Sequence, residues 1–167
     1  MPAFAAMVER AHALGEDGGG FSLVDPKSAR DNPAGLLRVL NDWDAGRNLP
    51  AGYVRQSTFW LVDDGVLCGE ARVRHALSPS LDIEGGHVGY FVHPDGRGRG
   101  LGHAILRLAL AELARLGIRR ALVTCNEGNV ASRRVIERAG GVLRSRGTSP
   151  RSGAIVLAFW VSTAAHD

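Results

Sequence analysis

Cysteine, long apolar runs and lysine are all scarce in this sequence. The 2 cysteines among its 167 residues, Cys68 and Cys125, are too few for a disulfide framework, and their spacing matches no metal site. Apolar runs stay shorter than the roughly 18 residues that a membrane-spanning helix requires. The N-terminal segment reaches Glu9 and Arg10 before a signal-type apolar core can form. These absences predict a cytoplasmic protein with reduced thiols, no secretory signal and no membrane partner.

Positive charge comes almost entirely from arginine, because Lys27 is the only lysine. The net charge of +3 indicates a mild attraction for anions, and arginine favours planar, bidentate contacts with phosphate. A general codon bias would explain the same preference. Aromatic residues make up only 6% of the chain, and no basic helix is interleaved with them, so nucleic acid is not an expected partner. With 45% hydrophobic and 22% charged residues, the composition is typical of one soluble globular domain.

The spacing of apolar residues predicts two helices, then a group of strands, then helices and strands in alternation. We expect helices at 3–14, 31–46, 98–117 and 129–141, strands at 57–64, 66–77, 87–92, 120–125, 141–146 and 154–161, and loops at 15–23 and 78–86. The helix between strands 87–92 and 120–125 is a crossover, which makes these two strands nearly parallel neighbours. This order predicts an α+β (mixed α/β) domain built on a central sheet.

The stretch "HPDGRGRGLGHA" at 93–104 places glycine at every second position between a predicted strand and a predicted helix. A dinucleotide-binding fingerprint that starts at Gly98 would need a third glycine where His103 stands, and a Walker A loop would need a lysine. Helix N-termini carry unpaired N–H groups and partial positive charge, so bare backbone at this place suits a diphosphate. A flexible glycine linker is the alternative interpretation.

Residues 97–102, Arg-Gly-Arg-Gly-Leu-Gly, resemble the Arg/Gln-x-x-Gly-x-Gly/Ala signature of the GNAT superfamily of acyl-CoA-dependent N-acyltransferases. "VHP" at 92–94 and "NVASRRVIERAGG" at 129–141 resemble the segment before that loop and the superfamily's later helix. The resemblance covers roughly residues 55–146 and is closest to a bacterial subgroup of largely unassigned substrate.

This resemblance implies a single domain, 1–167, in three parts: a helical acceptor-side segment (1–55), an acyl-CoA-binding core (56–146) and a C-terminal strand (147–167). The implied sheet is mostly antiparallel, has about six to seven strands, and is flanked by about four helices. It splays open between strands 87–92 and 120–125, where pantetheine pairs with the first strand.

Acetyl-CoA is the co-substrate that the resemblance implies. Phe91 and Val92 offer backbone groups to pantetheine and the acyl carbonyl, and the Val92 N–H is the expected oxyanion donor. Asn129 and Ser132 contact the cofactor from the later helix, although Asn129 is equally well explained as a plain N-cap. The diphosphate is expected on the loop residues Arg97, Gly98, Arg99, Gly100, Leu101 and Gly102.

The catalytic groups depart from the family pattern. Many GNAT proteins carry a tyrosine seven residues after the asparagine, as acid for the thiolate, and here that position is Ile136. Ser132, Cys125 and Tyr90 are the candidate substitutes.

For the general base we single out His87 and Glu70, with His75 and Glu84 as further candidates. The alternative interpretation of His87 is a histidine that is hydrogen-bonded to the adjacent turn. The alternative interpretation of Glu70 is a surface charge in an ion-pair ladder with Arg72 and Arg74 on the same strand face.

The sequence therefore predicts an acetyl-CoA-dependent N-acetyltransferase that acts on a primary amine of a small molecule or peptide by direct attack on the thioester. The alternative is a non-catalytic acyl-CoA-binding sensor or interaction module, which the missing tyrosine supports. The expected partners are acyl-CoA and an amine, in a monomer or homodimer. Asp42, Trp43 and Asp44 either suit a cationic acceptor or are solvent-facing charges around one core tryptophan.

Overall fold

The computed structural model describes residues 2–15 and 25–164, so most of the predicted loop at 15–23 lies outside the described residues. Its helices are α1 (Pro2–Ala13), α2 (Pro26–Asp31), α3 (Pro33–Asp44), α4 (Pro79–Ile83), α5 (Leu101–Arg115) and α6 (Val130–Arg138), with a short 3₁₀ turn at Pro94–Gly96. Its strands are β1 (Gln56–Asp63), β2 (Val66–Arg74), β3 (Val88–Val92), β4 (Arg120–Asn126), β5 (Val142–Thr148) and β6 (Ile155–Ser162).

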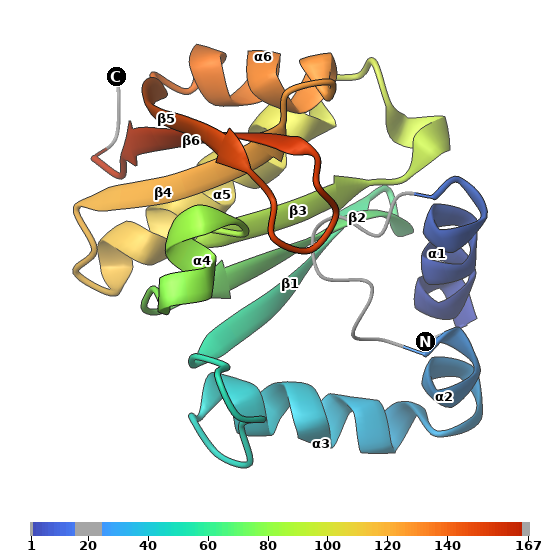
Figure 1. Ribbon diagram of the computed structural model, residues 1–167. Helices are drawn as coiled ribbons and strands as arrows, with labels where there is room; N and C mark the ends of the chain where they lie inside the picture. The colour runs from blue at the N-terminus through green and yellow to red at the C-terminus, as the bar shows by residue number, and fades with distance from the viewer. Residues whose placement is uncertain (1, 16–24, 165–167) are drawn as a thin grey trace.

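The strands form one sheet in the order β1-β2-β3-β4-β6-β5, which runs through the middle of the molecule (Figure 1). Every neighbouring pair is antiparallel except β3 and β4, which are parallel as the crossover predicted. The mixed α/β class and the mostly antiparallel sheet of six strands are confirmed.

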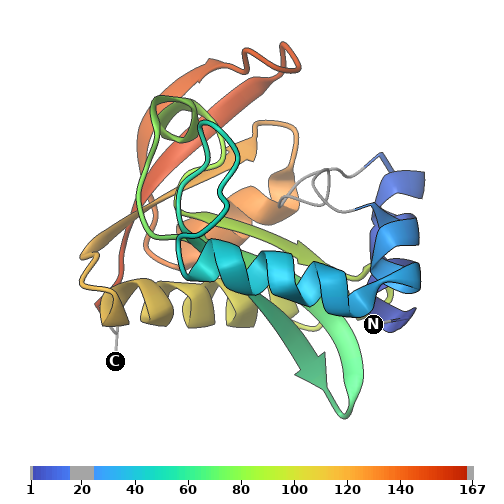
Figure 2. The same ribbon diagram turned by 90° about the horizontal axis from the view of Figure 1, so that it is seen from below.

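Helices cover both faces of this sheet. On one face, α5 and α6 pack against the main core, which contains Val88, Val123, Leu106 and Ile136. On the other face, α1 and α2 form a second apolar cluster with Phe91 and Trp60. Helix α3 lies along the β1 edge, and the tip of the β1–β2 hairpin projects beyond the helices (Figure 2).

Local sequence signals explain where several elements begin. The side chain of Asn32 caps α3 by accepting from the Gly35 N–H at 2.9 Å, and Pro33 follows it in the first turn. Between β1 and β2, Asp64 and Gly65 take φ values of 49° and 77°, which a two-residue hairpin turn of type I′ requires.

Four predictions about the elements were wrong in detail. The strand expected at 66–77 ends at Arg74, and the loop expected at 78–86 contains α4, which the Ser78 side chain caps. The helix expected at 98–117 is α5, which begins only after Gly100 because that residue is left-handed. The described residues form six α-helices instead of about four, since α2 and α4 are too short for a periodic signal.

The spacing of Leu101, Ile105, Leu108, Ala109 and Leu113 predicts one apolar face for α5, but Leu108 is 56% exposed. The buried residues are Ile105, Leu106, Ala109, Leu110 and Leu113. Both cysteines are buried and unpaired, as expected for reduced thiols.

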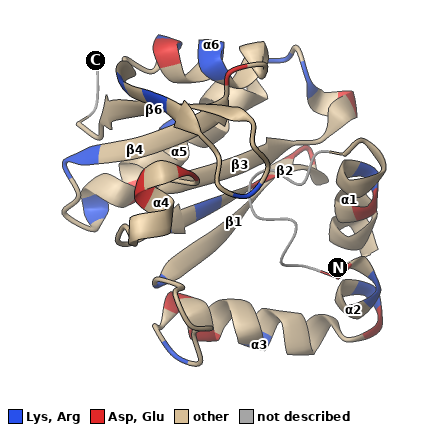
Figure 3. Cartoon of the chain, in the orientation of Figure 1, with Lys and Arg blue, Asp and Glu red and all other residues tan. Residues whose placement is uncertain are grey.

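Charged residues of both signs are interspersed along the elements (Figure 3). Several arginines are engaged in ion pairs, such as Arg133 with Glu137, Arg144 with Asp82 and Arg146 with Glu127. In the described part of the chain, no helix has both the length and the apolarity that crossing a membrane requires.

Candidate active site

The sheet opens between β3 and β4, the one parallel pair. These strands share a single backbone pairing, Val88 with Val123, and the His87 N–H donates to the Leu122 carbonyl at 2.7 Å. Beyond this point β3 stays paired with β2 as far as Val92, and β4 stays paired with β6 as far as Asn126. The splay predicted between strands 87–92 and 120–125 therefore begins directly after Val88.

Backbone polar groups line both sides of this opening. The Arg74 N–H donates to His87 O and the His93 N–H to Cys68 O, each at 2.8 Å. Hydrogen-bonded and non-hydrogen-bonded pairs alternate in an antiparallel ladder, and these two bonds make His87 and His93 hydrogen-bonded positions. Tyr90 and Val92 therefore fall at non-hydrogen-bonded positions and direct their N–H and C=O groups away from β2, toward β4. On the other side, bonds from Glu127 N to Ile155 O and from Thr163 N to Arg119 O fix the ladder with β6.

The same alternation turns the backbone groups of Thr124 and Asn126 toward β3. An extended chain that entered the opening would therefore meet donors and acceptors on both sides. The predicted backbone contact of Val92 fits this geometry, whereas Phe91 pairs through its backbone with Glu70 on β2. Sequence reasoning named Tyr90 as a candidate acid but missed its backbone, which the period of two along a strand puts in the same orientation as that of Val92.

The glycine loop lies at the end of β3 and leads into α5. Gly98 and Gly100 have φ values of 78° and 81°, which side-chain-bearing residues rarely adopt. A Cβ atom on either would meet no atom within 4 Å, so the space in front of the loop is open. Gly100 is the N-cap of α5 and provides no side-chain bond, and the His103 N–H bonds to the Gly100 carbonyl, so the N–H groups of Leu101 and Gly102 are left for an anion.

Gly102 also has a packing role, and its predicted contact with the diphosphate stays a prediction. A Cβ atom there would lie 3.3 Å from Cγ2 of Val135, so glycine lets α5 pack closely against α6. Arg97 donates from Nε to the Val92 carbonyl at 3.3 Å and stacks over the Phe91 ring at 5.5 Å. Arg99 extends to Asp63 at the end of β1, with an N–O distance of 2.7 Å.

Three of the candidate acids gather at the opening. Tyr90 and Cys125 each lie two residues beyond the Val88–Val123 pair and face α5 and α6. The Tyr90 hydroxyl is 3.0 Å from the Ser132 hydroxyl on α6. Burial raises the pKa of Tyr90 to about 12 and that of Cys125 to about 11, so both stay protonated at neutral pH. Ile136 is fully buried in the core, where it packs and carries no chemistry.

Asn129 caps α6, since its side-chain oxygen accepts from the Ser132 N–H at 3.0 Å. The N-cap interpretation of Asn129, which the sequence left open, is therefore present in the structure. The cap places Ser132 in the first turn of α6, beside the opening. Contact between Asn129 and a cofactor stays a prediction.

His87 ties the beginning of β3 to β4. Its Nδ1 accepts a hydrogen bond from the Leu122 N–H at 2.9 Å, so the neutral ring carries its proton on Nε2. Burial, followed by the charge of Arg74, lowers the pKa of His87. A general base would need the lone pair that this bond occupies, so the geometry does not favour the predicted role of His87.

Glu70 lies on the opposite face of the sheet from Tyr90, in the row that also contains Trp60 and Phe91. Its carboxylate accepts from Arg72 Nε at 2.8 Å and from the Trp60 indole N–H at 3.3 Å. Burial raises the pKa of Glu70, while the charge of Arg72 opposes that rise. The predicted ion pair with Arg72 is present, and it is buried instead of exposed.

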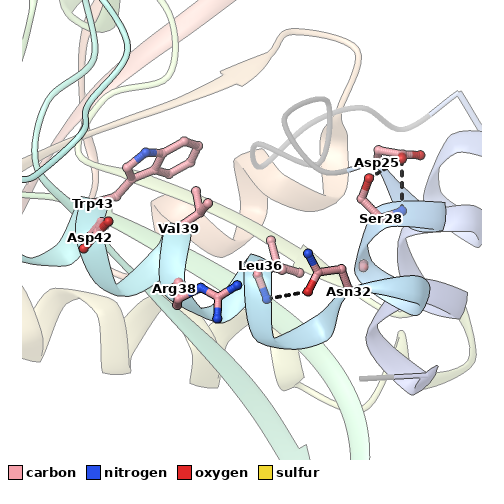
Figure 4. A pocket seen from close by; sticks show the side chains of 10 residues that line it. Asp25, Ser28, Asn32, Leu36, Arg38, Val39, Asp42 and Trp43 are labelled. Carbon is pink, nitrogen blue, oxygen red and sulfur yellow. Dashed lines mark hydrogen bonds between the residues drawn. The ribbon is translucent and has the colours of Figure 1, made fainter.

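A cavity of about 650 Å³ lies beside α2 and α3 (Figure 4). Asp42 and Trp43, the residues considered for a cationic acceptor, contribute to its lining. The Asp42 carboxylate already accepts from Arg47 and Asn48, which lower its pKa. Asp25, also in the lining, caps α2 through Lys27 N and Ser28 N. Neither carboxylate is therefore available as a strong cation site.

Comparison with known proteins agrees with this geometry. Residues 24–142 match the family model described as the acetyltransferase (GNAT) domain. The match spans most of the chain, including the glycine loop and the strands on either side of the opening, and the chain belongs to this family. The chain has no significant match among curated protein sequences.

Solved structures of similar fold are acetyltransferases. The yncA protein of Salmonella typhimurium, solved with acetyl-CoA, is 17% identical and has a TM-score of 0.65, with 99% of this chain and 90% of that chain covered. The ribosomal-protein-alanine N-acetyltransferase of Brucella melitensis is 18% identical and has a TM-score of 0.66, with coverage of 96% and 93%. RimL, a ribosomal L7/L12 α-N-protein acetyltransferase solved with coenzyme A, is 18% identical and has a TM-score of 0.67, with coverage of 98% and 89%.

Proposed function

We propose that the protein is an acetyl-CoA-dependent N-acetyltransferase that transfers an acetyl group to a primary amine of a small molecule or peptide. The observation that carries this proposal is the opening between β3 and β4. It has strand backbone without a partner strand on both sides, the open glycine loop at its end, and the Tyr90–Ser132 hydroxyl pair on one face. Two of the similar structures are acetyltransferases of ribosomal proteins, which supports an amine acceptor.

The residues at the opening fit coenzyme A. Val92 and Tyr90 would pair with the pantetheine amides as with an added strand, because their backbone groups face the gap. The α5 N-terminus, with Gly98 and Gly100 in front of it, would hold the diphosphate through backbone N–H groups. Arg97 and Arg99 add positive charge beside that position.

Chemistry then requires an oxyanion donor and a group that receives the departing thiolate. The Val92 N–H points into the opening, where it can stabilise the oxyanion that forms when the amine attacks the thioester carbonyl. Ser132, bonded to Tyr90, donates a hydrogen bond to the thiolate from the α6 side. The pair thus takes the place of the tyrosine that Ile136 replaces.

Glu70 is our candidate for the base that receives the amine proton. It pairs across the sheet with Phe91, one residue before Val92, and it lies on the face opposite Ser132. Amine attack from one face and thiolate departure toward the other would keep the two proton transfers apart. Burial raises the pKa of Glu70, and a higher pKa makes a carboxylate a stronger base.

Release of coenzyme A from acetyl-CoA, detected with a thiol reagent against a panel of primary amines and N-terminal peptides, tests this function. We expect amine-dependent release and a product heavier by one acetyl group on nitrogen. Tight binding of acetyl-CoA without acceleration by any amine would contradict the proposal and would indicate a non-catalytic acyl-CoA-binding module.

A further inference from the structure

Three buried nitrogen atoms on one face of β1 and β2 have no hydrogen-bond partner among the described residues. They are Nη1 and Nη2 of Arg72 and Nε2 of Gln56. Arg72 is 0% exposed and Gln56 is 3% exposed, so bulk water does not satisfy these donors. Buried donors without partners are costly, and a charged one more so, which indicates that a polar group belongs at this place.

The strand register brings the three atoms to the same region. Arg72 pairs with Thr58 on β1, and Gln56 is two residues before Thr58, so both side chains lie on one face of the sheet. Glu70 is on this face too, one row nearer to Val92. On the β3 side Arg72 faces Gly89, which contributes no side chain. The donors therefore lie on the face from which the amine would approach.

Two neighbouring arginines place positive charge on this face. Arg72 donates a hydrogen bond to Glu70 from Nε alone. The neighbouring Arg74 donates from Nη1 to the carbonyls of Gly85 and Gly86. Burial, followed by the charge of Arg72, lowers the pKa of Arg74 to about 10, so it remains cationic at neutral pH. Arg72 and Arg74 are therefore close enough for their charges to interact, only Arg72 bonds to Glu70, and an anion on the Nη atoms of Arg72 would offset this positive charge.

We propose that the acceptor is an amine that carries a carboxylate, which Arg72 binds with both Nη atoms and Gln56 with its amide N–H. This inference rests on the proposed function, because it takes the amine to lie near Glu70. Arg72 Nε lies 2.8 Å from the Glu70 carboxylate, so the ammonium and carboxylate groups of the acceptor would bind to adjacent side chains. An ω-amino acid, whose flexible chain separates its two charged groups by several carbons, can reach Glu70 and both Nη atoms of Arg72 together.

Calorimetric titration of the CoA-bound protein tests the inference without turnover. The probes are γ-aminobutyrate and δ-aminovalerate, each compared with the alkylamine that lacks only the carboxylate, propylamine and butylamine. We expect the amino acids to bind at least about tenfold more tightly than the matched amines, as a charge-assisted bidentate pair provides.

Two variants assign the effect to the proposed residues. Arg72→Lys keeps a cation beside Glu70 but loses the guanidinium fork, and Gln56→Met removes the unpartnered amide with little change of volume. Each substitution should lower the affinity for the amino acids by about tenfold and leave the affinity for the alkylamines unchanged. Arg146→Lys, at an exposed arginine on β5, is the matched control and should change neither affinity.

Equal affinity for amino acids and alkylamines, or no binding of any carboxylate, would overturn the inference and would indicate that ordered water satisfies these donors. Unchanged amino-acid affinity in Gln56→Met and in a folded Arg72→Lys would overturn it as well. Gln56→Met keeps the test decisive if Arg72→Lys fails to fold. Acetyl transfer to alkylamines without any preference for carboxylates would contradict this inference alone, whereas absence of transfer to every amine would contradict the proposed function.

Discussion

Replacing Gly100 by glutamate should abolish acetyl-CoA binding while the protein stays folded. Gly100 caps α5 at φ 81°, and a Cβ atom there meets nothing within 4 Å. The substitution therefore creates no clash. It costs about 1–2 kcal/mol for the left-handed backbone, and it places negative charge where the diphosphate should bind.

The other end of α5 offers a matched control. Gly117 has a φ of 80° and equally open surroundings, so Gly117→Glu introduces the same side chain at nearly the same backbone strain. For a domain of this size, about 1 kcal/mol corresponds to roughly 2–4 °C in Tm. Both variants should therefore melt about 2–8 °C below the wild type in the absence of ligand.

Ligand binding then separates the two variants. At a concentration of about 100 Kd, acetyl-CoA adds about 2.7 kcal/mol, which raises Tm by roughly 5–11 °C. Wild type and Gly117→Glu should show this rise in a thermal-shift assay, and Gly100→Glu should show none. An undiminished rise in Gly100→Glu would refute the assignment of the diphosphate to the glycine loop.

Four further predictions concern the chemistry and the core. Ser132→Ala should lower kcat by about 10²-fold with little change in acetyl-CoA affinity, and Tyr90→Phe should do so less strongly; steady-state kinetics with unchanged kcat in both would remove the pair from the mechanism. Ile136→Val, a change in the buried core, should cost about 0.5–1.5 kcal/mol in unfolding experiments and leave kcat unchanged, so a selective loss of turnover would reveal a missed catalytic role. Glu70→Gln should reduce kcat/KM by about 10²-fold near neutral pH, and the deficit should shrink at high pH where the amine is already neutral; a pH profile like that of wild type would place the base elsewhere. The pKa of His87 is lowered in the folded state, so stability should decline as the pH falls below about 6.5, where the unfolded chain takes up the proton first; His87→Gln should flatten this decline in denaturant titrations, and an identical decline would show that His87 does not cause it.

Elements with a local physical cause were predictable from the sequence. Asn32 and Asn129 can each accept a backbone N–H from the first turn of a helix, and α3 and α6 begin directly after them. Asp64 and Gly65 tolerate positive φ, and the chain reverses there. The beginning of α5 was misplaced because Gly98 and Gly100 have no side chain to signal a cap.

Burial of polar residues was not predictable, because alternation along a strand assigns side chains to a face but does not say what covers that face. The sequence left Glu70 open as a candidate base or as part of an ion-pair ladder with Arg72, and it did not show that both side chains are buried. His87 read as a candidate base for the same reason: its position at the beginning of a strand was visible in the sequence, whereas the Leu122 N–H that occupies its lone pair comes from β4, far along the chain.

The period of two along β2 and β3 explains how one sheet could serve two proton transfers. Val88, Tyr90 and Val92 face α5 and α6, where the Ser132 hydroxyl lies, while Glu70 and Arg72 face the opposite side. An acyl group held in the opening by the Val92 backbone would be reached from both faces. A one-residue shift of β3 against β2 would move Tyr90 to the side of Glu70 and bring the acid and base together. In the proposed mechanism, the Arg74–His87 and His93–Cys68 backbone bonds at the two ends of this pairing would therefore do more than stabilise the sheet, since the register that they hold would decide which face receives the amine and which receives the thiolate.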